Sequence, residues 1–169
     1  MAYNQTNYQR NSQKGYSGSS SNRSNNPRDN QVKLERLQIN IPLYDYFKDR
    51  AEIFLPDGLT EQAAQAFCTI SKSQLRKVLN TSKEALTVVQ KGADDIETAQ
   101  RILFMILPMA AYNKGRAGSK ERPAFEQLFN LMKDLINTKS IRSEKDIKMF
   151  DQIITSIVAY HSLCFKSNS

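Results

Sequence analysis

Apolar residues recur at spacings of three and four along most of the chain after residue 60, and no other feature limits the possible folds as much. Five segments carry this helical pattern, each with polar residues on its other side. No hairpin or strand–helix–strand pattern follows residue 45. A helix with one apolar side is stable only when another element covers that side. The sequence therefore predicts an all-α fold, a compact bundle of about five helices.

The five segments are preceded or opened by residues typical of helix starts: Thr60, Ser71, Asp94, Pro123 and Ser143. Ser71 is followed three residues later by Gln74, which predicts a capping box. We expect the first helix to cover residues 61–68 and Gly92 to end the second. Pro108 should kink the third helix, because proline lacks a backbone N–H. The predicted inward side chains of the last two helices are Phe125, Leu128, Met132, Leu135, Ile147, Phe150, Ile154, Ile157 and His161.

The chain before the bundle divides into two parts. Residues 1–30 hold seven Asn, six Ser and no Val, Ile, Leu or Phe, with four basic residues against one acidic, so we expect a disordered basic tail. Its Tyr and Arg residues suit contact with single-stranded nucleic acid, although a solvated tail without a fixed partner is the simpler interpretation. Residues 31–58 are predicted to form an irregular lead-in with a possible short helix over residues 44–54, and residues 59–169 the helical bundle.

Composition limits the function only weakly. Lys and Arg number 24 against 17 Asp and Glu, so the formal net charge is +7, which points toward a polyanionic partner. The N-terminus has no apolar leader and the longest aliphatic-rich stretch, residues 102–111, is too short to cross a bilayer, so we expect a cytoplasmic protein without a membrane partner. Two cysteines are too few for a disulfide framework or a zinc knuckle, and no metal or cofactor is expected.

The sequence carries no recognisable catalytic motif. It lacks a Walker loop, a dinucleotide-binding glycine pattern, an HExxH metal motif and a nucleophile elbow. Cys164 follows His161 by three residues, so the two side chains could touch on one helix face, but no orienting group or oxyanion site accompanies them. We interpret Cys68 and Cys164 as apolar packing residues and His161 as partly buried. The chain is therefore predicted not to be an enzyme.

Two basic clusters are the candidate binding sites. The first lies at the start of the second helix, where free backbone N–H groups and the helix dipole attract phosphate, although the capping box uses some of the same donors. The second lies where the third helix runs into a glycine loop, beside Tyr112. The candidate RNA-binding residues are Ser73, Gln74, Arg76, Lys77, Asn80, Lys114 and Arg116.

Both clusters also have a plain explanation as a solvated helix face and as cations at a helix C-terminus. A third set of basic residues, Lys139, Arg142, Lys145 and Lys148, is interleaved with Glu144 and Asp146, and we interpret it mainly as a solvated face. Because the donors are Arg, Lys, Ser and Asn with few aromatic residues, the pattern favours contact with the phosphate backbone without reading of bases.

Three stretches together resemble one family. Residues 71–79, SKSQLRKVL, resemble its S/T-x-S-Q-[IL]-R-x-[FIL]-L helix opening. Residues 107–116, LPMAAYNKGR, resemble its L-x-P-x-L-A-Y-x-x-G-R segment, and residues 150–161, FDQIITSIVAYH, resemble its C-terminal helix, F…EA-I-V-A-Y-H. The family is the small subunit of the type III-A CRISPR (Csm) effector complex. Ser156 stands where the family usually has Glu, and Ala111 replaces a bulkier residue.

The resemblance implies a non-catalytic subunit whose copies stack head to tail as an inner filament. The filament would lie beside the CRISPR RNA and line the path of the single-stranded target RNA, among the other subunits of the complex. Ser73, Gln74, Arg76 and Lys77, with Lys114 and Arg116, would contact the RNA backbone, and we expect the fold to join the two clusters into one groove. Two alternatives stay open: the small subunit of a type III-B complex, and a helical protein–protein adaptor with no nucleic-acid role.

Overall fold

The computed structural model describes residues 32–92 and 95–165. The main helices are α2 (Leu59–Ala66), α3 (Lys72–Lys91), α4 (Ile96–Phe104), α5 (Ile106–Arg116), α6 (Arg122–Leu135) and α7 (Glu144–His161). A short helix α1 (Leu43–Phe47) and a 3-10 turn η2 (Ala51–Phe54) precede them, and a 3-10 turn η3 (Ser162–Phe165) follows them. No strand occurs within the described ranges, and the all-α prediction is confirmed. The expected disordered tail, residues 1–30, lies outside them.

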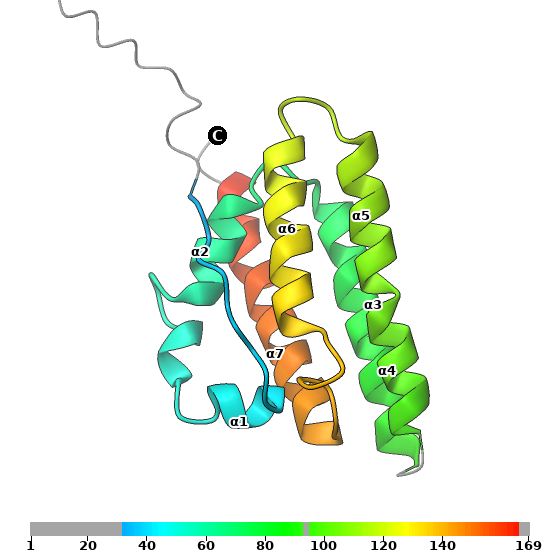
Figure 1. Ribbon diagram of the computed structural model, residues 1–169. Helices are drawn as coiled ribbons and strands as arrows, with labels where there is room; N and C mark the ends of the chain where they lie inside the picture. Colours follow the sequence, from blue (N-terminus) through cyan, green and yellow to red (C-terminus); the bar gives the residue numbers. More distant parts are fainter. Residues whose placement is uncertain (1–31, 93–94, 166–169) are drawn as a thin grey trace, which may run out of the picture.

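The helix α3, the continuous pair α4–α5, the helix α6 and the helix α7 run in alternating directions, which makes a compact bundle (Figure 1). The last of them, α7, packs against α3, α2 and α1. On the other side of the bundle α3 packs against α4, and α5 packs against α6. The nine predicted inward side chains of α6 and α7, from Phe125 to His161, are all buried, so that prediction is confirmed.

Local start signals were predicted with mixed success. Ser71 and Gln74 form the expected capping box at the start of α3, Gly92 follows its last residue, and the Ser143 side chain caps α7. The prediction for Thr60 is wrong. The helix α2 already begins at Leu59, and the buried Thr60 hydroxyl donates to the Ile53 carbonyl at 2.9 Å.

The predicted third helix is kinked enough to be two helices. It is interrupted at Met105, three residues before Pro108. Proline at position 108 cannot donate a hydrogen bond to the Phe104 carbonyl, and its ring crowds that carbonyl, so the break falls one turn upstream. The predicted cap Asp94 lies outside the described residues, and its neighbour Asp95 stands at the N-cap without a side-chain hydrogen bond.

The lead-in runs extended along α6, and side chains of that region supply its hydrogen bonds. Gln127 accepts from the Leu34 N–H and donates to the Val32 carbonyl, both at 2.7 Å. The Leu37 N–H donates to Asp134 Oδ2 at 2.9 Å, and Asn137 Nδ2 donates to the Ile39 carbonyl at 3.1 Å. An extended segment without a neighbouring strand needs such partners, since unpaired backbone groups are costly to bury.

Three aspartates are buried inside the bundle rather than exposed. Asp134, Asp146 and Asp151 are each less than a tenth exposed, and each accepts several hydrogen bonds. Asp146 accepts from the Tyr44 N–H at 2.8 Å, the Arg142 N–H at 3.1 Å and the Ser143 hydroxyl at 2.7 Å. The interpretation of Asp146 as part of a solvated face is therefore wrong, because its carboxylate joins α1 to the start of α7.

Cys68 and Cys164 form a disulfide with their Cα atoms 5.6 Å apart, although 96 residues separate them in the sequence. The expectation of two unpaired packing cysteines is wrong. The helices α2 and α7 pack side by side and run in the same direction (Figure 1), so the segment after α2 and the turn after α7 meet at one end of the bundle, which spacing along the chain cannot indicate. Within the described residues, no helix is both long enough and apolar enough to cross a membrane.

We predict that Asp146→Ala lowers the free energy of unfolding by about 3 kcal/mol, because it leaves the partly buried N–H groups of Tyr44 and Arg142 and the Ser143 hydroxyl without this acceptor. Urea unfolding followed by circular dichroism measures the change. Lys148→Ala, an exposed position on the same helix, is the control and should alter stability by no more than about 0.5 kcal/mol. Equal stability of the two variants would contradict the role given to Asp146.

Candidate nucleic-acid interface

The first basic cluster forms an exposed stripe along the first turns of α3. Ser73, Arg76, Lys77 and Asn80 are all exposed, whereas Leu75 and Val78 on the other side of the helix are buried. Helical spacing of three and four residues places the four polar side chains on the same side. Within the described part of the chain, neither Arg76 nor Lys77 takes part in an ion pair. We call these four residues the α3 stripe.

Gln74 is occupied by the helix cap. Its Oε1 accepts from the Ser71 N–H at 3.1 Å and from the Ser71 hydroxyl at 2.7 Å. The Ser73 hydroxyl also lies 3.1 Å from the Ser71 hydroxyl. The side-chain oxygen of Gln74 thus stabilises the start of α3, which leaves Arg76 and Lys77 as the free cationic groups of this cluster.

The second cluster lies at the end of α5, where Arg116 and Tyr112 form a pair. Arg116 Nη1 donates to the Tyr112 hydroxyl at 2.5 Å, and the guanidinium carbon lies 5.3 Å from the centre of the Tyr112 ring. Both residues are exposed. Because a cation stacked on an aromatic ring keeps its charge and several donors, this pair presents a guanidinium that is both fixed in place and accessible.

Lys114 is less available than Arg116 for contact with a ligand, because its ammonium group already has partners. Its Nζ lies 3.1 Å from Glu126 Oε1 on α6 and 5.6 Å from the centre of the Phe129 ring. A shallow hollow of about 420 Å³ between α5 and α6 is lined by Ala111, Lys114, Gly115, Arg122 and Phe129. Arg122 is not among the seven candidate residues, but it lines this hollow and so lies beside the second basic cluster.

The two clusters lie at the same end of the bundle, but they are not joined by a described hollow. The helix α3 begins, and α5 ends, at the upper end in Figure 1. None of the three most pronounced hollows on the described surface is lined by both α3-stripe residues and the end of α5. The structure thus places both clusters at one end of the bundle. The single groove expected from the sequence stays a prediction.

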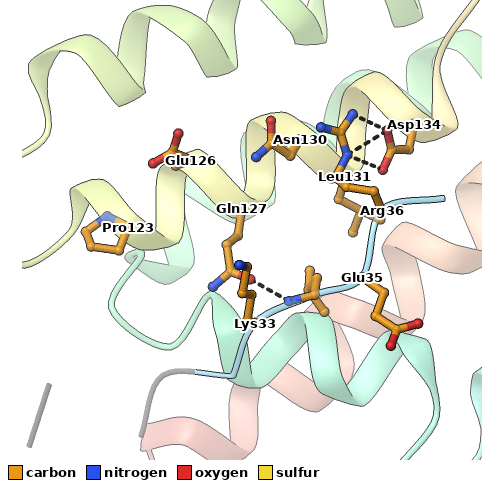
Figure 2. A pocket seen from close by; sticks show the side chains of 10 residues that line it. Lys33, Glu35, Arg36, Pro123, Glu126, Gln127, Asn130, Leu131 and Asp134 are labelled. Carbon is orange, nitrogen blue, oxygen red and sulfur yellow. Dashed lines mark hydrogen bonds and ion pairs between the residues drawn. The ribbon is translucent and has the colours of Figure 1, made fainter. Parts of the chain in front are cut away.

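The largest of the three hollows, of about 490 Å³, contains none of the candidate RNA-binding residues. It lies between the extended lead-in and α6, where Figure 2 shows Arg36 reaching Asp134. Arg36 Nε donates to both carboxylate oxygens, at 3.1 and 2.9 Å, and Nη2 donates to Oδ1 at 2.6 Å. These hydrogen bonds, followed by the attraction of the opposite charges, raise the pKa of Arg36 above its ordinary value. The two groups hold the lead-in in place.

The third basic set lies at the other end of the bundle, around the start of α7. Its four cations, Lys139, Arg142, Lys145 and Lys148, are exposed. Burial of Asp146 removes one of the two acidic residues that are interleaved with them in the sequence. Lys145 Nζ lies 5.4 Å from the centre of the half-exposed Tyr44 ring. This surface is accordingly more positive than the sequence indicates.

His161 is a buried structural residue. It is 1% exposed, and its Nε2 lies 3.0 Å from the Phe67 carbonyl oxygen. Its possible partner Cys164 is bonded to Cys68 instead, and His161 lines none of the three described hollows. A Cys–His nucleophile is therefore not assembled. Within the described residues, no group of three or more His, Cys, Asp and Glu could hold a metal ion.

The family model for Csm2 Type III-A matches residues 57–167, from just before α2 to the end of the bundle. This chain belongs to the Csm2 family. The resemblance seen in the three sequence stretches is thereby confirmed, and the type III-A family is favoured over the small subunit of a type III-B complex. Csm2 is thus a subunit of a type III-A CRISPR effector complex, which it shares with other Csm subunits. No curated protein and no solved structure gives a significant match.

We predict that His161 makes the stability of this Csm2 chain depend on pH. Burial lowers the pKa of His161 below the ordinary value of 6.5, and the nearby Lys72 acts in the same direction, against hydrogen bonds to the Phe67 and Ile70 carbonyls. The unfolded chain then binds a proton more readily, so the stability contributed by neutral His161 is complete above about pH 6.5 and is lost as the pH falls.

His161→Gln removes this titration. The urea midpoint of the wild type should fall more between pH 7 and pH 5 than that of the variant, with the disulfide intact in both. Parallel pH profiles for the two proteins would contradict the assignment.

Proposed function

We propose that this Csm2 chain is a non-catalytic subunit that holds single-stranded RNA by its sugar–phosphate backbone. The α3 stripe and the Tyr112–Arg116 pair are the proposed contacts. The observation that carries the proposal is the set of cations at one end of the bundle that have no acidic partner in the described chain: Arg76, Lys77 and Arg116. An unpaired surface cation binds phosphate more readily than one already held by a carboxylate.

The donor types favour backbone contact over reading of bases. Arg, Lys, Ser and Asn reach phosphate oxygens and ribose hydroxyls irrespective of sequence. In an RNA-guided complex, base pairing with the guide supplies the specificity, so a subunit of this kind should ignore base identity. We place Gln74 and Lys114 among the lesser contacts, because the first stabilises a helix cap and the second an ion pair.

We further propose that copies of the chain stack head to tail beside the CRISPR RNA and along the target RNA, in the cytoplasm. A single copy with a few phosphate contacts binds weakly, and several copies on one strand gain affinity because they are linked. Basic residues at both ends of the bundle support this arrangement, because RNA that leaves one copy then meets positive charge on the next. Cleavage of the target is assigned to other subunits.

The alternative function, a protein–protein adaptor, is favoured by one observation. Met105 and Tyr112 on the α4–α5 side are 64% and 60% exposed, which is high for large apolar side chains. Protein interfaces are rich in such residues. Tyr112 belongs to both proposed surfaces, so the two functions are distinguished by whether the isolated chain binds RNA in a salt-dependent way.

We predict that Arg116→Ala and Arg76→Ala each weaken binding of single-stranded RNA. Each should also lower the slope of log affinity against log salt by about 0.7 for every phosphate that the variant no longer neutralises. The weakening should be equal for a uridine homopolymer and for a mixed sequence of the same length. Fluorescence anisotropy at several salt concentrations measures both quantities.

The matched control is Arg101→Ala, which removes the same charge from an exposed arginine that is paired with Glu97 on α4. It should leave the slope unchanged. Weaker binding confined to one RNA sequence, or an effect of Arg101→Ala equal to that of Arg116→Ala, would argue against backbone contact at these residues.

We also predict that His161→Ala spares target RNA cleavage by the assembled complex, because the only histidine of the chain is buried and contacts a carbonyl. Cleavage is measured on complexes of equal subunit content, verified by mass spectrometry. Loss of cleavage in a fully assembled complex would restore the hypothesis of a catalytic role.

A further inference from the structure

The disulfide fastens the turn after α7 to the segment that follows α2. Cys68 lies two residues after the end of α2, and Cys164 lies in η3, directly after α7. Both side chains are partly accessible to solvent. In η3 no residue is buried, and Leu163 and Phe165 are 49% and 40% exposed. Segments with little buried apolar surface open easily, so a covalent bond to the segment after α2 restrains this turn.

The turn η3 covers His161 and reaches the start of α3. The Phe165 ring lies edge-on to the His161 ring, with 5.1 Å between centres. Lys72 Nζ lies 4.7 Å from the centre of the same Phe165 ring. Lys72 is the first residue of α3, directly before the α3 stripe. The disulfide, His161 and Lys72 therefore form one connected set of contacts around Phe165.

We propose that Cys68 and Cys164 are a reversible redox couple that fastens η3 over His161 and against the start of α3. The reductant is a low-molecular-weight thiol of the glutathione class. Its thiolate attacks one cysteine sulfur, the S–S bond breaks and a mixed disulfide forms. A second thiolate then displaces the remaining cysteine. Two small thiols become one small disulfide, and both cysteines take up a proton and remain as thiols.

The cellular compartment determines whether this disulfide is permanent or reversible. In cytoplasm, small thiols keep most cysteines reduced, and the disulfides that do form there are usually transient or redox-sensing. The proposal takes the cytoplasmic location from the proposed function, but it does not depend on RNA binding. Oxidation would close the turn, whereas reduction would release Phe165 from His161 and from Lys72.

The experiment uses the full chain equilibrated in glutathione buffers from fully reduced to fully oxidised. A maleimide–polyethylene glycol gel shift counts the free thiols, and diethyl pyrocarbonate followed by mass spectrometry reports the accessibility of His161, the only histidine. We expect two labelled thiols and fast modification of His161 in the reduced chain, and no labelled thiols and slow modification in the oxidised chain. The melting temperature should be about 10 °C lower after reduction, because the disulfide closes a long loop.

The control is the Cys68→Ser/Cys164→Ser double variant, which should behave like the reduced chain in every buffer. The proposal is overturned if both thiols stay labelled in the most oxidising buffer, or if His161 reacts equally fast in the two redox states of the wild type. RNA binding is measured in parallel in both states. Its absence in both would contradict the proposed function and leave the redox result standing.

Discussion

The structure depends on burial of the inward side of α7, which packs against α3, α2 and α1. Nine of its side chains are buried, from Asp146 to His161. Removal of this much apolar surface from water is the main favourable contribution to folding, and it positions the neighbouring helices relative to one another. The start of α3 and the end of α5 come to the same end of the bundle because the helices alternate in direction around this core (Figure 1).

Hydrogen bonds to buried carboxylates fix how the neighbouring elements pack against α7 and α6. Asp151 on α7 accepts from the Ser82 hydroxyl at 3.0 Å and from Lys83 Nζ at 2.6 Å, and so ties α3 to the central helix. Asp134 and Asp146 hold the lead-in and α1 in the same way. A buried charge is tolerated only where hydrogen bonds satisfy it, so each carboxylate fixes one arrangement of its neighbours. Asp134 and Asp151 each pair with a half-exposed cation, Arg36 and Lys83 respectively, at 2.6 Å.

Local signals predicted most of the helices, and long-range contacts explain the errors. The Ser71–Gln74 box and the Ser143 cap lie within a few residues of the helices that they begin, so the sequence alone indicates them. Thr60 was assigned to a cap because its other partner, the Ile53 carbonyl, lies across a turn. The seven candidate RNA-binding residues were predicted as two clusters. The structure separates Gln74 and Lys114 from the others, because the Gln74 oxygen caps a helix and Lys114 is in an ion pair with Glu126.

By itself the sequence determined the helical class, the positions of the long helices, the family and the two basic segments, because each depends on spacing within a few turns or on a motif. Tertiary structure alone decided the disulfide over 96 residues, the Tyr44–Asp146 bond over 102 and the Arg36–Asp134 pair over 98. Such pairs form only when the whole chain packs, and no local preference distinguishes an aspartate that will be buried from one that will face water.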